Sequence, residues 1–433
     1  MIGSIGYLLG ILSIRNFCFA YFFCAPLFIN QGMRLPVGAI FAAGYLFSAP
    51  IVLLEIARRL CSFQHKFRIG KLEALILSLA FISFLSVAVK TPDKLLSFDK
   101  HFIWYFKFLI PAFSFLIMVR MWKREDLSKL YTLLFVFVMI SLGLTVTQIA
   151  VDIPPAVEPG RYSAFYRDSN HFAVLLNILY SFTLPMAISR MLEKKRGMGY
   201  PALNILLLIA IGLTGSRSGF LCTALLTGSS LIATRAWKTI LPLGFLILPF
   251  LGFFVYIVKS RYTSGSGSAA MSDMGRIWTY LTAFNIIQAN PLLGIGFGNV
   301  LDVFQEYGKI YAALIGRPID IHNAFLEIFA ETGILGFACY ALLIGIPFTR
   351  LAKRVKADSH YFYPLVDLVG LNIVIVFLVH GMVYPEFLGH DDFWVYYSVV
   401  FLIMRSRIRE PGFQFRLFPK RSETQLTEPF QSP

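Results

Sequence analysis

Apolar runs long enough to cross a lipid bilayer recur along this chain, and they constrain its fold more than any other feature. Of its 433 residues, 57% are hydrophobic and only 15% are charged, whereas a soluble globular protein has about 25% charged residues. The pattern predicts an all-α polytopic membrane protein with about twelve transmembrane helices, each built from roughly 20 mainly apolar residues. The expected spans lie near 9–30, 36–57, 73–90, 101–119, 128–151, 170–189, 200–214, 218–234, 239–258, 322–349, 362–384 and 391–405.

Basic residues fill every second loop between these runs. Clusters of Lys and Arg lie at 58–71, 120–129, 190–196, 235–238 and 350–356. Cytoplasmic loops of membrane proteins carry such an excess, so we expect these loops and both termini in the cytoplasm. The net charge of +15 then reflects membrane orientation, and we expect membrane lipids rather than nucleic acid as partners. The five cysteines lack the spacing of a disulfide framework or a metal site.

The longest loop, 259–321, falls outside the cytoplasm by this alternation. Within it, apolar residues recur at helical spacing behind Ser272, which could cap a helix. They are Ile277, Trp278, Leu281, Phe284 and Ile287. We therefore expect an amphipathic helix that lies on the outer boundary of the membrane.

Three arginines occur in polar segments on the outer side. Arg161 lies in GRYSAFYRDSNHFA, which also contains Asn170, Arg217 lies in GSRSGF, and Arg276 lies in GRIWTYLTAF one turn before Tyr280. The sequence around Arg217 contains no acidic partner. Arginine suits bidentate phosphate contacts, and a helix start adds backbone N–H groups. The set favours a phosphate-bearing ligand, although Arg217 alone could equally snorkel to the interface.

The stretch IHNAFLEIFAETGILG places polar residues at the mouth of an apolar run. Asp320 could cap a helix that starts near His322, and the helix dipole would then keep the imidazole neutral and able to accept a proton. Asn323, Glu327 and Glu331 share one face of that helix, which we expect to face the bundle interior or a water-filled cavity. The alternative is a structural histidine with glutamates that bond neighbouring helices.

Other polar residues are weaker candidates. His171, beside Asn170, competes with His322 as a base, whereas His380 and His390 are interpreted as packing or rim residues, with Asp391 and Asp392 exposed. PLLGIGFGN (291–299) resembles a nucleotide-binding loop in its glycines, but it has no preceding strand or cytoplasmic location. We interpret it as a glycine-rich turn.

The order of these motifs resembles the O-antigen ligase and polymerase superfamily of bacterial envelope glycosyltransferases. It runs from the Arg/Asn segment through Ser-Arg-Ser-Gly, Gly-Arg-x-x-x-Tyr and Pro-Leu-Leu-Gly-x-Gly to His-Asn-x-x-Leu-Glu-x-x-x-Glu-x-Gly-x-x-Gly. The resemblance implies a GT-C-like helical fold, a glycan donor on undecaprenyl diphosphate and an acceptor hydroxyl on lipid A-core or a growing glycan. It implies no metal or cofactor, and a site at the periplasmic face of the bacterial inner membrane.

The resemblance also assigns residues. Arg217, Arg276 and, less closely, Arg161 match the arginines that hold the diphosphate, and His322 matches the base. Asn323, Glu327, Glu331, Asn170 and Tyr280 are then expected on the acceptor side or as support. The chain divides into transmembrane helices over 1–159, a catalytic core over 160–345, further transmembrane helices over 346–405 and a cytoplasmic tail over 406–433.

Two alternatives to a ligase remain: a polymerase, which fits the sequence equally well, and a transporter, which fits it less closely. A polymerase that extends the glycan differs in acceptor rather than in chemistry, and the sequence does not separate it from a ligase. A transporter of polysaccharides or small anions would place polar residues at the bilayer midplane. Here the candidate residues gather at one outer boundary, which favours an enzyme.

Overall fold

The computed structural model describes residues 70–90, 126–151, 161–164, 168–192, 199–235, 268–315, 318–357, 364–384 and 391–405, with the single positions 112, 122, 252, 255, 256 and 259. The helices are α4 (Lys71–Lys90), α6 (Asp126–Ala150), α7 (Ser169–Leu192), α8 (Gly199–Thr214), α9 (Arg217–Thr234), α11 (Ser268–Ala289), α12 (Val300–Gly308), α13 (Ile310–Ile315), α14 (Ala324–Ala357), α15 (Pro364–Gly381) and α16 (Asp391–Arg405). The described ranges contain no strand, as expected for an all-α protein.

Four of the described helices, α4, α6, α7 and α14, are long and apolar enough to cross a membrane, and α8, α15 and α16 contain shorter apolar helices. These helices fall where the sequence predicts spans. The spans expected near 9–30, 36–57, 101–119 and 239–258 lie outside the continuous described ranges, so the total of about twelve stays a prediction.

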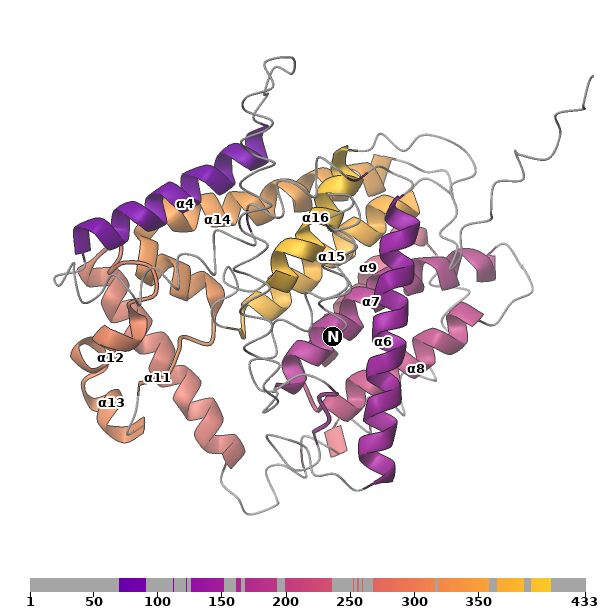
Figure 1. Cartoon of the computed structure of the whole chain (residues 1–433), viewed down its shortest axis with the longest axis horizontal. Coiled ribbons are helices and arrows are strands. Elements are labelled where there is room, and N and C mark those ends of the chain that lie inside the picture. The colour runs from indigo at the N-terminus through magenta and orange to yellow at the C-terminus, as the bar shows by residue number, and fades with distance from the viewer. Residues whose placement is uncertain are drawn as a thin grey trace, which may run out of the picture.

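Helix α7 lies at the centre of one group of helices, against α6, α8, α9 and α15 (Figure 1). Gly219 lets α7 and α9 approach closely, because a Cβ at this position would stand 2.7 Å from the Cβ of Ala173. Asn177 reinforces the contact: its amide donates to the Gly219 carbonyl oxygen at 3.0 Å and its Oδ1 accepts from the Thr223 hydroxyl at 2.8 Å. The beginning of α9 is therefore held firmly against α7.

Helix α15 is tied to α9 by a second buried polar contact. Oδ1 of Asn372 accepts from the Ser229 hydroxyl at 2.7 Å, and its amide donates to the Ser230 hydroxyl at 3.0 Å. Buried polar groups of this kind are costly unless paired, so the pairing fixes the register between the two helices.

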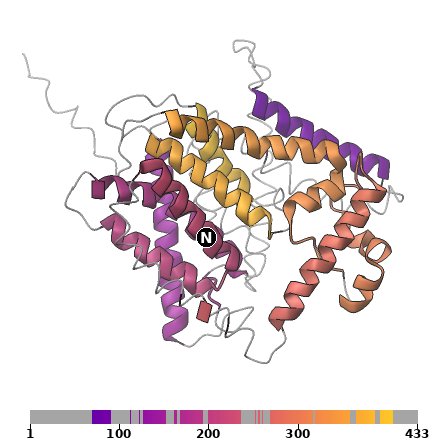
Figure 2. The ribbon, with the colours of Figure 1, turned by 180° about the vertical axis from the view of Figure 1, so that it is seen from behind.

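Helix α14 is broken near its beginning. Gly333 has φ 65° and ψ −169°, which only glycine adopts readily. The span expected over 322–349 is therefore not one continuous helix. A glycine-rich loop over 291–299 joins α11 to α12 and packs into the break, while α4 runs alongside α14 in both views (Figures 1 and 2).

The helix expected within the longest loop is present as α11, but it begins earlier than predicted. It starts at Ser268, so Ser272 lies inside the helix rather than capping it. Ile277, Leu281 and Phe284 are 51%, 39% and 50% exposed on one face. Buried residues of its other face, among them Ala283 and Ile286, form a small core with residues that include Ile295, Val300, Ile321 and Ala330.

Candidate functional site

A tight turn presents Arg217 as the first residue of α9. Gly215 takes φ 60°, and Ser216 caps the helix by accepting a hydrogen bond from the Gly219 N–H at 3.1 Å. The positive end of the helix dipole thus lies beside the Arg217 side chain. This agrees with the helix start expected in the GSRSGF segment.

Arg161, which lies before α7 in the chain, hydrogen-bonds to this turn. Its Nε donates to the Thr214 carbonyl oxygen at 3.0 Å, and its Nη2 donates to Oδ1 of Asn170 at 3.1 Å. The Ser216 hydroxyl donates to the same Asn170 oxygen at 2.7 Å. The structure therefore brings Arg161 and Asn170 together with the start of α9, and both are engaged by protein groups.

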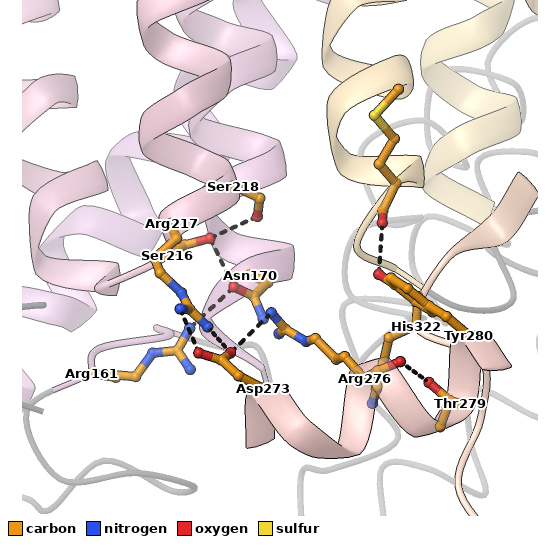
Figure 3. Close-up of polar contacts among 11 residues, drawn as sticks. Arg161, Asn170, Ser216, Arg217, Ser218, Asp273, Arg276, Thr279, Tyr280 and His322 are labelled. Atoms are coloured by element: carbon orange, nitrogen blue, oxygen red, sulfur yellow. Dashed lines mark hydrogen bonds and ion pairs between the residues drawn. The ribbon is translucent and has the colours of Figure 1, made fainter. Parts of the chain in front are cut away.

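Arg217 meets Asp273 of α11 through a two-pronged ion pair (Figure 3). Its Nη1 donates to Oδ2 of Asp273 at 2.9 Å, and its Nη2 donates to Oδ1. The sequence around Arg217 contains no acidic partner, and the fold supplies one from a distant segment. Nη1 of Arg276, one turn along α11, lies 4.0 Å from the same Oδ1. Asp273 thus brings two of the predicted arginines to one point.

One N–H donor of the Arg276 guanidinium has no acceptor among the described residues. This donor is the Nε, which is buried. A buried guanidinium N–H without a partner is costly in a folded protein. It suits a site that an acidic ligand occupies during function.

His322 lies close to Arg276, on the segment that leads into α14 (Figure 3). The single proton of the Tyr280 hydroxyl is shared between two carbonyl oxygens, that of His322 at 3.0 Å and that of Met382 at 3.2 Å. Tyr280 thus ties the histidine segment to α11 and to the end of α15. Tyr280 contacts the backbone of His322, and its role toward a substrate stays a prediction.

The helix after His322 is capped by a different residue from the one expected. Oδ1 of Asn323 accepts from the N–H groups of Phe325 at 3.0 Å and Leu326 at 3.1 Å. The expectation that Asp320 caps this helix is wrong, because α14 begins at Ala324 and the cap residue is the one just before it. Asn323 is therefore occupied in holding the helix start.

The charge environment of His322 favours the neutral imidazole. Burial lowers the pKa of His322 and the positive charge of Arg276 lowers it further, whereas the Asp168 carboxylate raises it. Asp168 lies at the start of α7, where its Oδ1 accepts from the Asn170 N–H at 2.8 Å. An uncharged imidazole can accept a proton, as a general base requires.

Glu327 and Glu331 are buried in the first part of α14, at 5% and 4% exposure. They face the bundle interior, which is one of the two surroundings expected for them. The Glu331 carbonyl oxygen accepts from the Gly296 N–H at 3.0 Å, so this residue also belongs to the junction between α14 and the glycine-rich loop.

The competing histidines lie in packed surroundings. His171 shares a hydrogen bond of 2.7 Å between its Nδ1 and the Tyr384 hydroxyl, and His380 is fully buried in α15. The burial of His380 agrees with its interpretation as a packing residue. His390 and the side chains of Asp391 and Asp392 lie outside the described residues.

Two acidic residues near the site, Asp273 and Asp168, are not among those predicted from the sequence. Asp273 stands one helical turn before Arg276, a spacing at which opposite charges attract, and this was the available signal. Asp168 lies in the GRYSAFYRDSNHFA segment, two residues before Asn170. Among the described residues, no three His, Cys, Asp or Glu side chains gather as a metal site would require.

The central part of the chain matches a known family model. The family model described as O-antigen ligase matches residues 202–341. The matched segment contains Arg217, Asp273, Arg276 and His322, and this confirms the resemblance drawn from the motifs. No curated protein matches the chain.

Proposed function

We propose that this chain, with an O-antigen ligase domain at its centre, is a membrane glycosyltransferase. It moves a glycan from undecaprenyl diphosphate to an acceptor hydroxyl on lipid A-core or a similar molecule. The observation that carries the proposal is the convergence of Arg217 and Arg276 from two helices on one point beside His322.

The two arginines suit the leaving group. Transfer breaks the bond between the anomeric carbon and the diphosphate oxygen, and negative charge grows on the diphosphate as the bond lengthens. Fixed cations in a partly buried site stabilise such developing charge more than they would in water. Arg217 offers a planar fork of two donors, and Arg276 adds a buried N–H without a partner among the described residues. Arg161 contributes by holding the turn from which Arg217 projects.

His322 suits the acceptor. The acceptor oxygen forms the new bond to the anomeric carbon, its proton passes to the imidazole, and the bonding electrons leave with undecaprenyl diphosphate. Burial and Arg276 lower the pKa of His322 and keep the ring ready for the proton. Tyr280 holds the backbone at this residue, while Asn323 fixes the beginning of the next helix and Glu327 and Glu331 support it from within the bundle.

The site opens to the periplasm in this proposal. The alternation of basic loops places the segment 259–321 on the outer face of a bacterial inner membrane, in a protein with about twelve spans. The exposed apolar stripe on α11, which includes Ile277, Leu281 and Phe284, then rests at the membrane boundary. An active site there meets a lipid-linked donor in the outer leaflet.

Reconstitution tests the proposal. The purified protein is incubated in lipid vesicles with undecaprenyl-diphosphate-linked glycan and lipid A-core, and the products are separated by gel electrophoresis and mass spectrometry. We expect glycan on the core and release of undecaprenyl diphosphate, and we expect both to be lost in Arg217→Ala. Arg350→Ala, at an exposed arginine of α14, serves as the control.

The acceptor that is used decides between ligase and polymerase. A polymerase would lengthen the lipid-linked glycan and leave lipid A-core unmodified. Absence of transfer to any acceptor, from protein that remains folded in the vesicles, would rule out the glycosyltransferase proposal.

A further inference from the structure

Asp273 occupies the place where the proposed diphosphate must bind. Both carboxylate oxygens engage the fork of Arg217, and one of them lies 4.0 Å from Nη1 of Arg276. The pair joins α9 to α11 across the site (Figure 3). The side chains are 36% and 32% exposed, so solvent and ligand can reach the contact.

A carboxylate and a phosphate compete for the same face of an arginine. Both present two oxygens to the planar fork, so Arg217 cannot bind both in this way at once. Like charges brought close together also disfavour each other strongly in a partly desolvated site. A diphosphate that reaches Arg217 therefore has to displace the Asp273 carboxylate.

We infer that Asp273 is a built-in counter-ion of the donor site, displaced when the lipid diphosphate binds and able to displace the lipid diphosphate after transfer. The inference rests on the proposed function. Donor and product carry the same diphosphate, so arginines that bind the donor well also retain the product. A competing carboxylate lowers the affinity for both and shortens the time that the product stays bound.

The same exchange connects ligand binding to the position of α11. In the structure Asp273 holds α11 against the beginning of α9 through Arg217. When diphosphate takes over the fork, this link is lost and the ligand itself bridges Arg217 and Arg276. Asp273 is thus a positioning residue that acts through the arginines.

Binding of farnesyl diphosphate, a short lipid diphosphate, to the purified full-length protein in nanodiscs tests this inference by calorimetry. We expect Asp273→Asn to bind it about fivefold to tenfold more tightly than wild type, a modest factor because the ion pair is exposed enough to be screened. The gain should shrink as ionic strength rises. Asp302→Asn removes the same charge from an exposed position on α12 and should leave affinity unchanged.

Turnover gives the second readout. Under multiple-turnover conditions Asp273→Asn should show a fast first turnover followed by a slower steady rate, with stronger inhibition by added undecaprenyl diphosphate. Asp273→Glu keeps the charge and should behave like wild type in product inhibition. If Asp273→Asn does not accumulate, Asp273→Ser removes the charge with a smaller side chain and takes its place.

The outcomes separate the two proposals. Unchanged or weaker farnesyl diphosphate binding in the charge-removing variants, with binding still lost in Arg217→Ala, would overturn the counter-ion role and leave the donor site standing. Tighter binding in Asp302→Asn as well would also overturn it, because the effect would then be one of net charge. No binding to wild type or to any variant would overturn the donor site and the counter-ion together.

Discussion

The backbone N–H of Ile295 donates to the carbonyl oxygen of Ala330 at 3.0 Å, and this bond joins the glycine-rich loop to the broken beginning of α14. The Glu331 carbonyl oxygen and the Ile334 N–H, on either side of Gly333, are also paired with the loop, through Gly296 and Pro291. Buried backbone groups that a helix break leaves open need such partners. The loop thus supplies hydrogen-bond partners for backbone groups around the break in α14, the helix that follows His322.

Gly333→Ala should destabilise the protein and reduce transfer together. Its φ of 65° disfavours any side chain, and a Cβ there would collide with the Leu292 carbonyl group. A strained residue of this kind costs about 1–3 kcal/mol before the collision is counted. Gly345→Ala, on the same helix with open space around it, is the control and should keep or raise the melting temperature. Equal thermal stability of the two variants in detergent would contradict this account of the junction.

Arg217→Lys should fail almost as badly as Arg217→Ala in glycan transfer. Lysine keeps the charge but loses the planar fork that binds two oxygens at once, and Arg217 uses that fork on Asp273 in the structure. Transfer is measured in cells at equal protein level, with Arg350→Lys as the matched control. Near-normal transfer by Arg217→Lys would favour a simple electrostatic role.

Substitution of His322 should abolish transfer without abolishing donor binding. A positioned general base contributes about 10²–10⁴-fold in rate, and in the proposed function the arginines, not the histidine, hold the diphosphate. His322→Gln should fail like His322→Ala, since an amide cannot take the proton. Rates and farnesyl diphosphate affinity are measured on the same purified samples. Rapid turnover by His322→Gln would restrict the histidine to hydrogen bonding and move the search for the base to Glu327, Glu331 or His171.

The acid limb of the pH–rate profile should lie below the ordinary histidine value of 6.5. Burial and Arg276 lower the pKa of His322, so the imidazole stays unprotonated to lower pH, and activity is lost only as the pH falls through that lowered pKa. Arg276→Gln should move the limb to higher pH, and Asp168→Asn should move it to lower pH because it removes the charge that raises the pKa. Opposite or absent shifts in kcat/KM profiles would show that another group titrates.

Topology can be read from two introduced cysteines. Glu306 on α12 and Lys353 near the end of α14 are both exposed, and the alternation of basic loops places them on opposite sides of the membrane. In a variant without native cysteines, Glu306→Cys should react with a membrane-impermeant thiol reagent added to spheroplasts, and Lys353→Cys should react only after lysis. The reverse pattern would invert the orientation.

Much of the fold and part of the site followed from local features of the sequence. Apolar runs of sufficient length gave the positions of α4, α6, α7 and α14, because a helix satisfies its backbone within one segment. The GSRSGF segment indicated a helix start at Arg217, whereas the diphosphate role of the arginines and the base role of His322 stay predictions. The glycines of PLLGIGFGN correctly indicated a turn.

Contacts between distant segments were decided only by the tertiary structure. The partner of Arg217 is Asp273 on another helix, and a pairing of this kind depends on how α9 and α11 meet rather than on the residues beside either one. The break at Gly333 likewise needs the loop over 291–299 to fill it. Asn323 rather than Asp320 is the cap because α14 begins at Ala324, the residue after Asn323. Sequence spacing fixes which groups share a helix face, whereas helix packing fixes which faces meet.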